Sequence, residues 1–141
     1  AFDKYDFTGK RVMIAEDVAL NMEVAVKMLS LVGIETHCAE NGKEAVKLFE
    51  NEPDHYFDCI LMDVNMPEMN GLEAAMHIRQ SKKPDAKSIP IYAMTANVFA
   101  EDIAAVRASG MNGHIAKPVD VNELYSTLQD VFSKQDKKGK E

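Results

Sequence analysis

Basic residues are in short supply in this sequence, and the shortage excludes one class of function. The chain has 141 residues, of which 16 are Lys or Arg and 23 are Asp or Glu, so its formal net charge is -7. Contacts to the phosphates of nucleic acids need clustered cations, which an acidic chain does not supply. We therefore expect this chain to make no direct contact with nucleic acid.

Long apolar runs are also missing. No stretch reaches the roughly 18 apolar residues that a membrane-spanning helix needs, and the first six residues, AFDKYD, carry too much charge for a secretory signal. We expect a cytoplasmic domain that makes no membrane contact of its own, whether or not a parent protein is anchored in a membrane.

Cysteine is scarce, and a glycine-rich phosphate loop is absent. The two cysteines, Cys38 and Cys59, lie in short apolar segments outside any Cys-x-x-Cys pattern, which predicts two buried thiols in a reducing compartment. The four histidines share no spacing typical of zinc ligands. Without a glycine-rich loop, the chain is not expected to bind ATP.

Short apolar runs alternate with helical patterns along the whole chain. Strands are expected at residues 12–15, 36–39, 57–62, 89–94 and 114–116, and helices at residues 20–31, 44–50, 71–79, 100–109 and 121–132. Continuous apolar strands that alternate with helices indicate an α/β fold, in which helices cover both faces of a parallel sheet. An amino-terminal arm (1–9) precedes this domain (10–132), and a charged tail (133–141) follows it.

Acidic residues follow two of these strands directly. Glu16 and Asp17 come after the first strand, and Asp63 comes after the third. Because ligands bind at the carboxyl ends of the strands in open α/β sheets, we expect the three carboxylates to meet there. Hard oxygen ligands suit Mg²⁺ when phosphate is also bound. A cation or the ammonium of Lys117 would offset the repulsion between the acids.

The remaining strand ends carry a hydroxyl and an ammonium group. Thr95 is followed by the small Ala96, so it can donate to a phosphoryl oxygen; the alternative is an N-cap for the helix near Ala100. Lys117 precedes Pro118, whose peptide bond can be cis. Its ammonium can reach a phosphate, or it is an exposed lysine at a turn. A carboxylate such as Asp63 can form an acyl phosphate when such groups stabilise the transferring phosphoryl group.

Together these segments resemble the receiver domain of two-component signalling proteins. The resemblance covers about residues 10–132 and rests on IAED (14–17), ILMDVNMPEMNG (60–71), MTAN (94–97) and KP (117–118). It implies a flavodoxin-like (βα)5 doubly wound sheet with strand order 2-1-3-4-5. It also implies a phosphorelay function, in which a histidine kinase or a histidine phosphotransfer domain is the partner.

The resemblance assigns a metal site to the acidic cluster. It implies that Asp63 accepts a phosphoryl group from a phosphohistidine with Mg²⁺ as cofactor. Asp17 and Asp63 would ligate the metal directly, Asn65 would contribute its backbone carbonyl, and Glu16 would act mainly through water.

Further residues would handle the phosphoryl group and report its arrival. The resemblance implies that Thr95 and Lys117 bind the phosphoryl oxygens and that Thr95 takes part in the conformational switch. His114 occupies the other switch position, where the family often has Tyr or Phe. Asn65 and Asn97 sit where side chains tune the lifetime of the aspartyl phosphate.

Two segments point to a larger context. DFTGKR (6–11) and MTANVFAED (94–102) look like the corresponding parts of hybrid sensor histidine kinases. The resulting hypothesis is that the chain is a piece of such a kinase; the alternative is a stand-alone single-domain response regulator. The receiver would itself catalyse phosphoryl transfer and autodephosphorylation, whereas the parent protein would be a histidine kinase. The face from Ala100 to Phe132 is the candidate surface for partners or a dimer.

Two other readings fit the motifs less well. Haloacid dehalogenase-like phosphohydrolases carry a second Asp two residues after the nucleophile, and this chain has Asn65 there. A degenerate receiver that serves only for docking would lack an essential residue, and none is lost.

Overall fold

The structure is a computed structural model that describes the backbone of residues 5–140 and the side chains of residues 5–137. Five strands and five helices alternate within this range: β1 (Arg11–Ala15), α1 (Ala19–Ser30), β2 (Glu35–Ala39), α2 (Gly42–Asn51), β3 (Cys59–Asp63), α3 (Gly71–Arg79), β4 (Ile91–Thr95), α4 (Ala100–Ala108), β5 (Gly113–Ala116) and α5 (Val121–Lys140). All strand pairs are parallel, in the order β2-β1-β3-β4-β5. The predicted fold class and strand order are confirmed.

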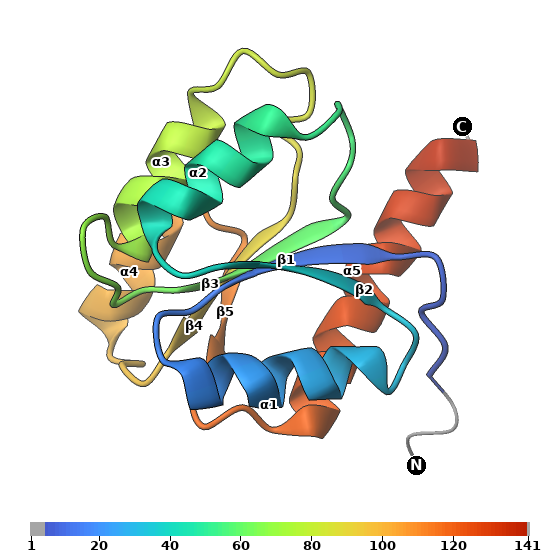
Figure 1. Ribbon diagram of the computed structural model, residues 1–141, viewed down its shortest axis with the longest axis horizontal. Helices are drawn as coiled ribbons and strands as arrows, with labels where there is room; N and C mark the ends of the chain where they lie inside the picture. The colour runs from blue at the N-terminus through green and yellow to red at the C-terminus, as the bar shows by residue number, and fades with distance from the viewer. Residues whose placement is uncertain (1–4, 141) are drawn as a thin grey trace.

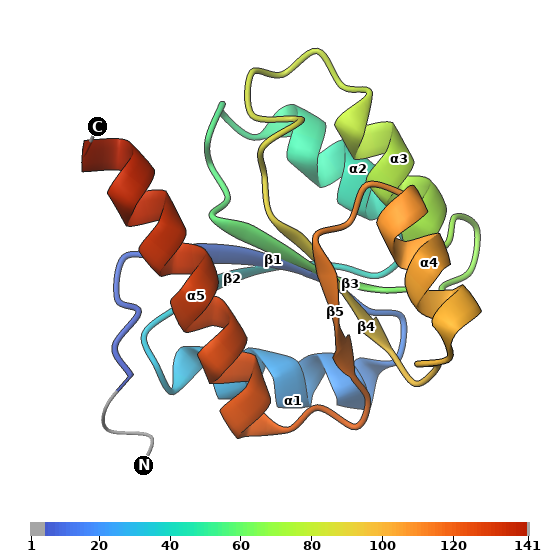
Figure 2. The same cartoon turned by 180° about the vertical axis from the view of Figure 1, so that it is seen from behind.

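The sheet separates two layers of helices. α1 and α5 cover one face, and α2, α3 and α4 cover the other (Figures 1 and 2). Successive residues of a strand point to opposite faces, so Met13 and Ala15 of β1 join the core beneath α2 and α3, while Val12 and Ile14 join the core beneath α1 and α5. Because both faces are covered, the inner strands β1, β3 and β4 are apolar over most of their length.

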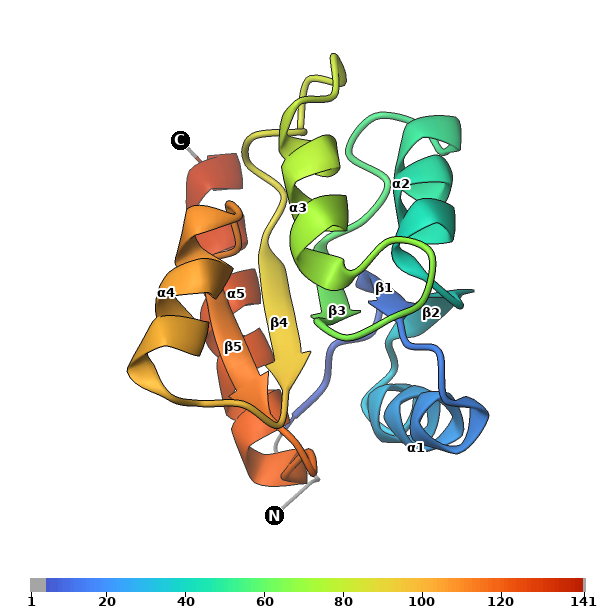
Figure 3. The ribbon, with the colours of Figure 1, turned by 90° about the vertical axis from the view of Figure 1, so that its left-hand side faces the viewer.

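The carboxyl ends of the strands lie along one edge of the sheet. Figure 3 shows the arrowheads of β3, β4 and β5 pointing toward the same edge. β1 lies between β2 and β3, with Ile14 beside Cys38 on one side and Leu61 on the other. The chain leaves β1 and β3 toward opposite faces of the sheet, and such a topological switch point is where open α/β sheets bind ligands.

Local capping explains where two helices begin. Asn41 accepts a 2.8 Å hydrogen bond from the backbone N–H of Glu44 at the start of α2. Asn70 and Glu73 form a reciprocal capping box at the start of α3. Two of the three Asn-Gly pairs of the sequence are therefore helix starts. After α1, Gly33 has a positive φ of 86°, a conformation that glycine adopts without strain.

The last helix is longer than predicted. The apolar spacing that predicted a helix over residues 121–132 ends there, but α5 continues to Lys140. Gln135 donates from Nε2 to the carbonyl oxygen of Asp58 at 2.6 Å, and Lys10 Nζ lies 3.0 Å from Asp136 Oδ1. The charged tail is thus helical where it is described, because its residues have adequate helix propensity and tertiary contacts hold it.

The described part of the amino-terminal arm packs against the domain. Phe7 is buried, and its backbone N–H donates to the carbonyl oxygen of Val32 at 2.7 Å. Its ring lies 5.2 Å from that of Phe132, centroid to centroid. Residues 1–4, which belong to the same predicted arm, lie outside the described residues.

The prediction for the two cysteines is half right. Cys59 is fully buried in the central strand β3, whereas Cys38 is exposed on the edge strand β2. An edge strand has a neighbour on one side only, and its apolar residues do not have to face the core. None of the helices within residues 5–140 is long and apolar enough to cross a membrane.

Candidate functional site

Three carboxylates converge at the carboxyl ends of β1 and β3. The side chains of Glu16, Asp17 and Asp63 each place one oxygen within 4.8 Å of the others. Glu16 is 3% exposed and Asp63 is 6% exposed, while Asp17 lies on the surface. Because Ala15 lies beside Met62, the next residues along the two chains, Glu16 and Asp63, are brought together. The predicted meeting of the acids is therefore present in the structure.

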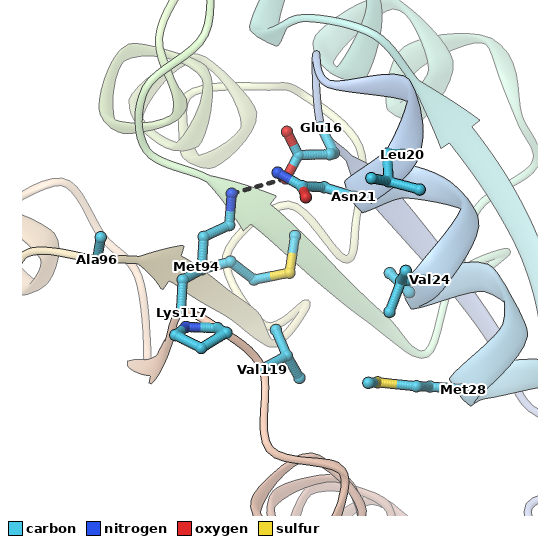
Figure 4. A pocket seen from close by; sticks show the side chains of 11 residues that line it. Glu16, Leu20, Asn21, Val24, Met28, Met94, Ala96, Lys117 and Val119 are labelled. Atoms are coloured by element: carbon cyan, nitrogen blue, oxygen red, sulfur yellow. Dashed lines mark hydrogen bonds and ion pairs between the residues drawn. The ribbon is translucent and has the colours of Figure 1, made fainter.

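Lys117 reaches into this cluster from the end of β5. Its Nζ lies 2.7 Å from Glu16 Oε1 and 3.2 Å from Asp63 Oδ2. Figure 4 shows the side chain extending from the β5 end toward Glu16. The peptide bond between Lys117 and Pro118 is cis, as the sequence allowed. The alternative of an exposed turn lysine is wrong, because the ammonium is shared between two buried acids.

The pKa values of the charged groups in this cluster shift in different directions. Burial raises the pKa of Asp63 to about 6; the ammonium of Lys117 opposes this shift and the carboxylate of Glu16 adds to it. Burial also acts to raise the pKa of Glu16, but hydrogen bonds from Lys117 and from the Val18 backbone lower its net pKa. For Lys117 the two acids outweigh burial and raise its pKa. Glu16 and Lys117 thus form the ion pair, and Asp63 is the acid with the more costly negative charge.

Backbone groups hold the two buried acids in place. The N–H of Val18 donates to Glu16 Oε2 at 3.0 Å, and the N–H of Asn65 donates to Asp63 Oδ1 at 3.3 Å. A small hard cation prefers this type of donor set, namely several carboxylate oxygens within a few ångströms. The surface position of Asp17 leaves room for the water ligands that Mg²⁺ retains. The residues present therefore fit a divalent cation.

Thr95 ends β4 next to this cluster. The residue is buried, and its Oγ1 accepts a 3.0 Å hydrogen bond from the N–H of Asn97. It also lies 3.3 Å from the carbonyl oxygen of Asn97, to which the hydroxyl donates. The alternative that Thr95 caps the next helix is wrong, because α4 begins after Phe99 and has no side-chain cap.

His114 lies on β5, beside β4. The register pairs Ala93 with His114 and Thr95 with Ala116. Paired residues of parallel strands point to the same face, and so do residues two apart along a strand. His114 and Thr95 therefore share the sheet face that α4 covers, and His114 is half-buried there.

Gly71 supports the loop after Asp63 in a way that the sequence did not reveal. Its backbone N–H donates to the carbonyl oxygen of Val64 at 2.9 Å. A Cβ atom at this position would overlap the backbone carbonyl oxygen of Asp63. The only signal in the sequence was the Asn70-Gly71 pair, which also suits an ordinary turn.

An apolar pocket of about 530 Å³ adjoins the acids on the α1 side. Glu16 and Lys117 lie at one end of it, and Leu20, Val24 and Met28 of α1 line its wall (Figure 4). Leu20 and Val24 are exposed. The position of these side chains beside the acids depends on the packing of α1.

The sequence comparisons identify the family. The sequence model described as "Response regulator receiver domain" matches residues 12–129.

The chain is a response regulator receiver domain. Among its relatives, "Probable histidine kinase 6" of Oryza sativa subsp. japonica is 36% identical over 136 residues, which cover 85% of this chain and 14% of the relative. "Hybrid signal transduction histidine kinase I" of Dictyostelium discoideum is 31% identical over 121 residues, which cover 84% of this chain and 7% of the relative. This receiver therefore resembles those of hybrid histidine kinases and spans about one seventh or less of the length of these curated relatives.

Solved receiver structures share its fold. The receiver domain of sensor histidine kinase PA1611 from Pseudomonas aeruginosa PAO1 is 31% identical, with a TM-score of 0.80 over 89% of this receiver and 99% of that chain. That structure holds a magnesium ion coordinated in the active site cleft. The chemotaxis protein CheY4 of Vibrio cholerae is 30% identical, with a TM-score of 0.79 over 86% of this receiver and 98% of that chain.

Proposed function

We propose that this receiver accepts a phosphoryl group from a phosphohistidine onto Asp63. The single observation that carries this proposal is the shared position of Lys117 Nζ, within 3.2 Å of Asp63 Oδ2 and 2.7 Å of Glu16 Oε1. It places a fixed positive charge beside a buried carboxylate at the open edge of the sheet. Phosphoryl transfer depends mainly on such positioning and electrostatic stabilisation.

The transfer follows from the chemistry of these groups. An oxygen of the Asp63 carboxylate forms a bond to phosphorus, the phosphorus–nitrogen bond of the phosphohistidine breaks, and the imidazole leaves with the electron pair and takes up a proton. Lys117 stabilises charge on the phosphoryl oxygens. In this proposal the Thr95 hydroxyl, which donates to the Asn97 carbonyl oxygen at 3.3 Å, turns to donate to the same phosphoryl group.

We propose Asp17, Asp63 and the backbone carbonyl of Asn65 as ligands of Mg²⁺, with Glu16 acting through water. When bound by these residues, Mg²⁺ would neutralise charge on the phosphoryl oxygens. The mutual distance of the three carboxylates, within 4.8 Å, supports this proposal.

Labelling with acetyl phosphate tests both proposals. We expect wild-type protein and Mg²⁺ to yield one acid-labile phosphoryl group, located by mass spectrometry on Asp63. Asp63→Asn should abolish the label, Asp17→Asn should make it weak at any Mg²⁺ concentration, and EDTA should prevent it. Asp54→Asn, which alters an exposed acid outside the cluster, is the matched control and should label normally. Full labelling of Asp63→Asn would refute the phosphoacceptor assignment.

We infer that Thr95 and His114 report the phosphorylation to the face formed by α4, β5 and α5. Their common sheet face beneath α4 supports this inference. Lys117→Ala and Thr95→Ala should retain part of the labelling but show a weaker change in amide hydrogen exchange over α4 and β5. If the change in exchange on phosphorylation is as large in these variants as in wild type, the substituted residues do not take part in the switch.

The partner is proposed to be a histidine kinase or a histidine phosphotransfer domain, and the parent protein a hybrid sensor histidine kinase rather than a stand-alone regulator. Its relatives by sequence support the hybrid context. The face from Ala100 to Phe132 remains the predicted surface for partners or a dimer. Sedimentation of the chain with and without phosphorylation tests the dimer, and phosphotransfer from purified phosphotransfer domains tests the partner.

A further inference from the structure

The loop between β3 and α3, residues 64–70, is held at both of its ends. At the end near the acidic cluster, the N–H of Asn65 donates to Asp63 Oδ1 at 3.3 Å. At the other end, the carbonyl oxygen of Met69 accepts a 2.9 Å hydrogen bond from the N–H of Gly42. Figure 3 shows the loop passing the start of α2, to which Gly42 belongs. The loop therefore joins the acidic cluster to the start of α2.

One residue of this loop has an unfavourable backbone conformation. Glu68 has a φ of 67°, in the left-handed region that residues with a Cβ rarely adopt. Such a conformation persists only where the surrounding structure holds it. Asn41 donates from Nδ2 to Glu68 Oε2 at 3.5 Å, and Gly42 holds the next residue, Met69. The turn formed by Asn41 and Gly42 therefore supports the loop where its backbone is least favourable.

Gly42 can make its contact because it has no side chain. A Cβ atom at this position would overlap the carbonyl oxygen of Met69 and would lie 2.9 Å from that of Asn70. The φ of Gly42 is outside the left-handed region, so its backbone conformation does not require glycine. Alanine also forms helices better than glycine does. The close approach of the loop is therefore the physical reason for glycine at the start of α2.

We propose that Gly42 is a positioning residue for the divalent-cation site and acts on it through the loop. The inference rests on the Mg²⁺ site proposed above, in which the Asn65 backbone carbonyl is a ligand. The N–H of Met69 donates to the carbonyl oxygen of Pro67 at 2.7 Å, so the far end of the loop is a tight turn. A displacement of Met69 from Gly42 is therefore passed along the chain and moves the Asn65 carbonyl relative to Asp63. Groups that orient metal ligands in this way contribute to metal affinity without contacting the metal.

The Mg²⁺ affinity of the Gly42→Ala chain, measured by calorimetric titration at neutral pH, tests this proposal. We expect binding about tenfold weaker than in wild type, the usual effect of losing a group that orients a ligand. Gly113→Ala is the matched control, because it adds the same methyl group at the amino end of β5, 3.0 Å from the ring of Tyr92. This control should bind Mg²⁺ as wild type does, even if it is less stable.

The same titration separates failure of the metal site from failure of the positioning role. If wild type binds no Mg²⁺ at millimolar concentration, the metal site proposed above is wrong and this inference fails with it. If wild type binds Mg²⁺ and Gly42→Ala binds it equally well, the metal site stands and only the positioning role of Gly42 is wrong.

Amide hydrogen exchange of the wild-type chain, followed by NMR, gives a second test that needs no variant to fold. Coupling between two sites is reciprocal, so Mg²⁺ should slow the exchange of the Gly42 N–H by up to about tenfold. The N–H of Glu44 is the internal control: it lies in the same turn of α2 but donates to Asn41 and not to the loop. Its exchange should slow much less. An equal effect of Mg²⁺ on both amides, or no effect on Gly42, would overturn the proposal.

Discussion

Lys117 Nζ lies 2.7 Å from Glu16 Oε1, and the ion pair joins residues 101 positions apart in the chain. It connects the end of β5 to the end of β1 across the edge of the sheet. Since Glu16 is almost fully buried, this pair determines how much negative charge remains on the cluster. Asp63 shares the same ammonium at the longer distance of 3.2 Å.

The lysine should stabilise the fold when no metal is bound. Lys117→Ala leaves two buried carboxylates without their cation, so we expect the free energy of unfolding in EDTA to fall by about 2 kcal/mol. This is less than a fully buried pair would lose, because 21% of the lysine side chain is exposed. Saturating Mg²⁺ should recover much of the loss, since it binds the folded state.

Urea unfolding with and without Mg²⁺ measures this effect. Lys10→Ala is the matched control, because it removes the surface ion pair with Asp136. Lys10→Ala should change the free energy of unfolding by about 0.5 kcal/mol or less, and this change should be the same with and without Mg²⁺. If Mg²⁺ raises the free energy of unfolding of Lys117→Ala and of Lys10→Ala by the same amount, Lys117 does not offset the charge of the acidic cluster.

Metal binding should weaken in acid. The pKa of Asp63 is raised to about 6 in the metal-free protein, mainly by burial. Protons therefore compete with Mg²⁺ below about pH 6 and no longer do so at neutral pH. We expect Mg²⁺ to bind about tenfold more weakly at pH 5 than at pH 7. Calorimetric titration at the two values measures the ratio, and an affinity independent of pH would contradict the raised pKa.

A methyl group at Gly71 should disturb the loop after Asp63. The Cβ of Gly71→Ala would overlap the Asp63 carbonyl oxygen, so the backbone of the loop or of α3 must move. We expect a stability loss of about 1–3 kcal/mol and slower labelling by acetyl phosphate. Met76→Ala, on the exposed side of α3, should keep the wild-type labelling rate. A fully active and stable Gly71→Ala would show that the loop does not depend on this contact.

The helical extension of α5 should contribute to stability. Deleting residues 133–141 removes the Gln135 hydrogen bond to Asp58 and the Asp136 pair with Lys10. Together these losses should cost about 1–2 kcal/mol. Deleting residues 138–141 alone keeps both contacts and should cost much less. Thermal unfolding of the two truncated chains makes the comparison, and identical midpoints would mean that the extension does not stabilise the domain.

Much of the candidate site was predictable because its residues follow apolar strands. In a parallel sheet the carboxyl ends share one edge, so the recognised strands placed Glu16, Asp17, Asp63, Thr95 and Lys117 along that edge. The alternation of apolar strands and helices predicted that helices cover both faces of the sheet, because each element follows from a local pattern of apolar residues. The length of α5 was not predictable from apolar spacing, because polar contacts hold its last turns.

The sequence by itself determined the strands, the helices and the types of group at the strand ends, since these depend on local patterns of apolar and polar residues. Only the tertiary structure decided that Lys117 pairs more closely with Glu16 than with Asp63, that Cys38 is exposed on the edge strand, and that Gly42 donates a hydrogen bond to Met69. Such relationships join residues far apart in the chain, and they depend on strand order and side-chain packing, which no local pattern encodes.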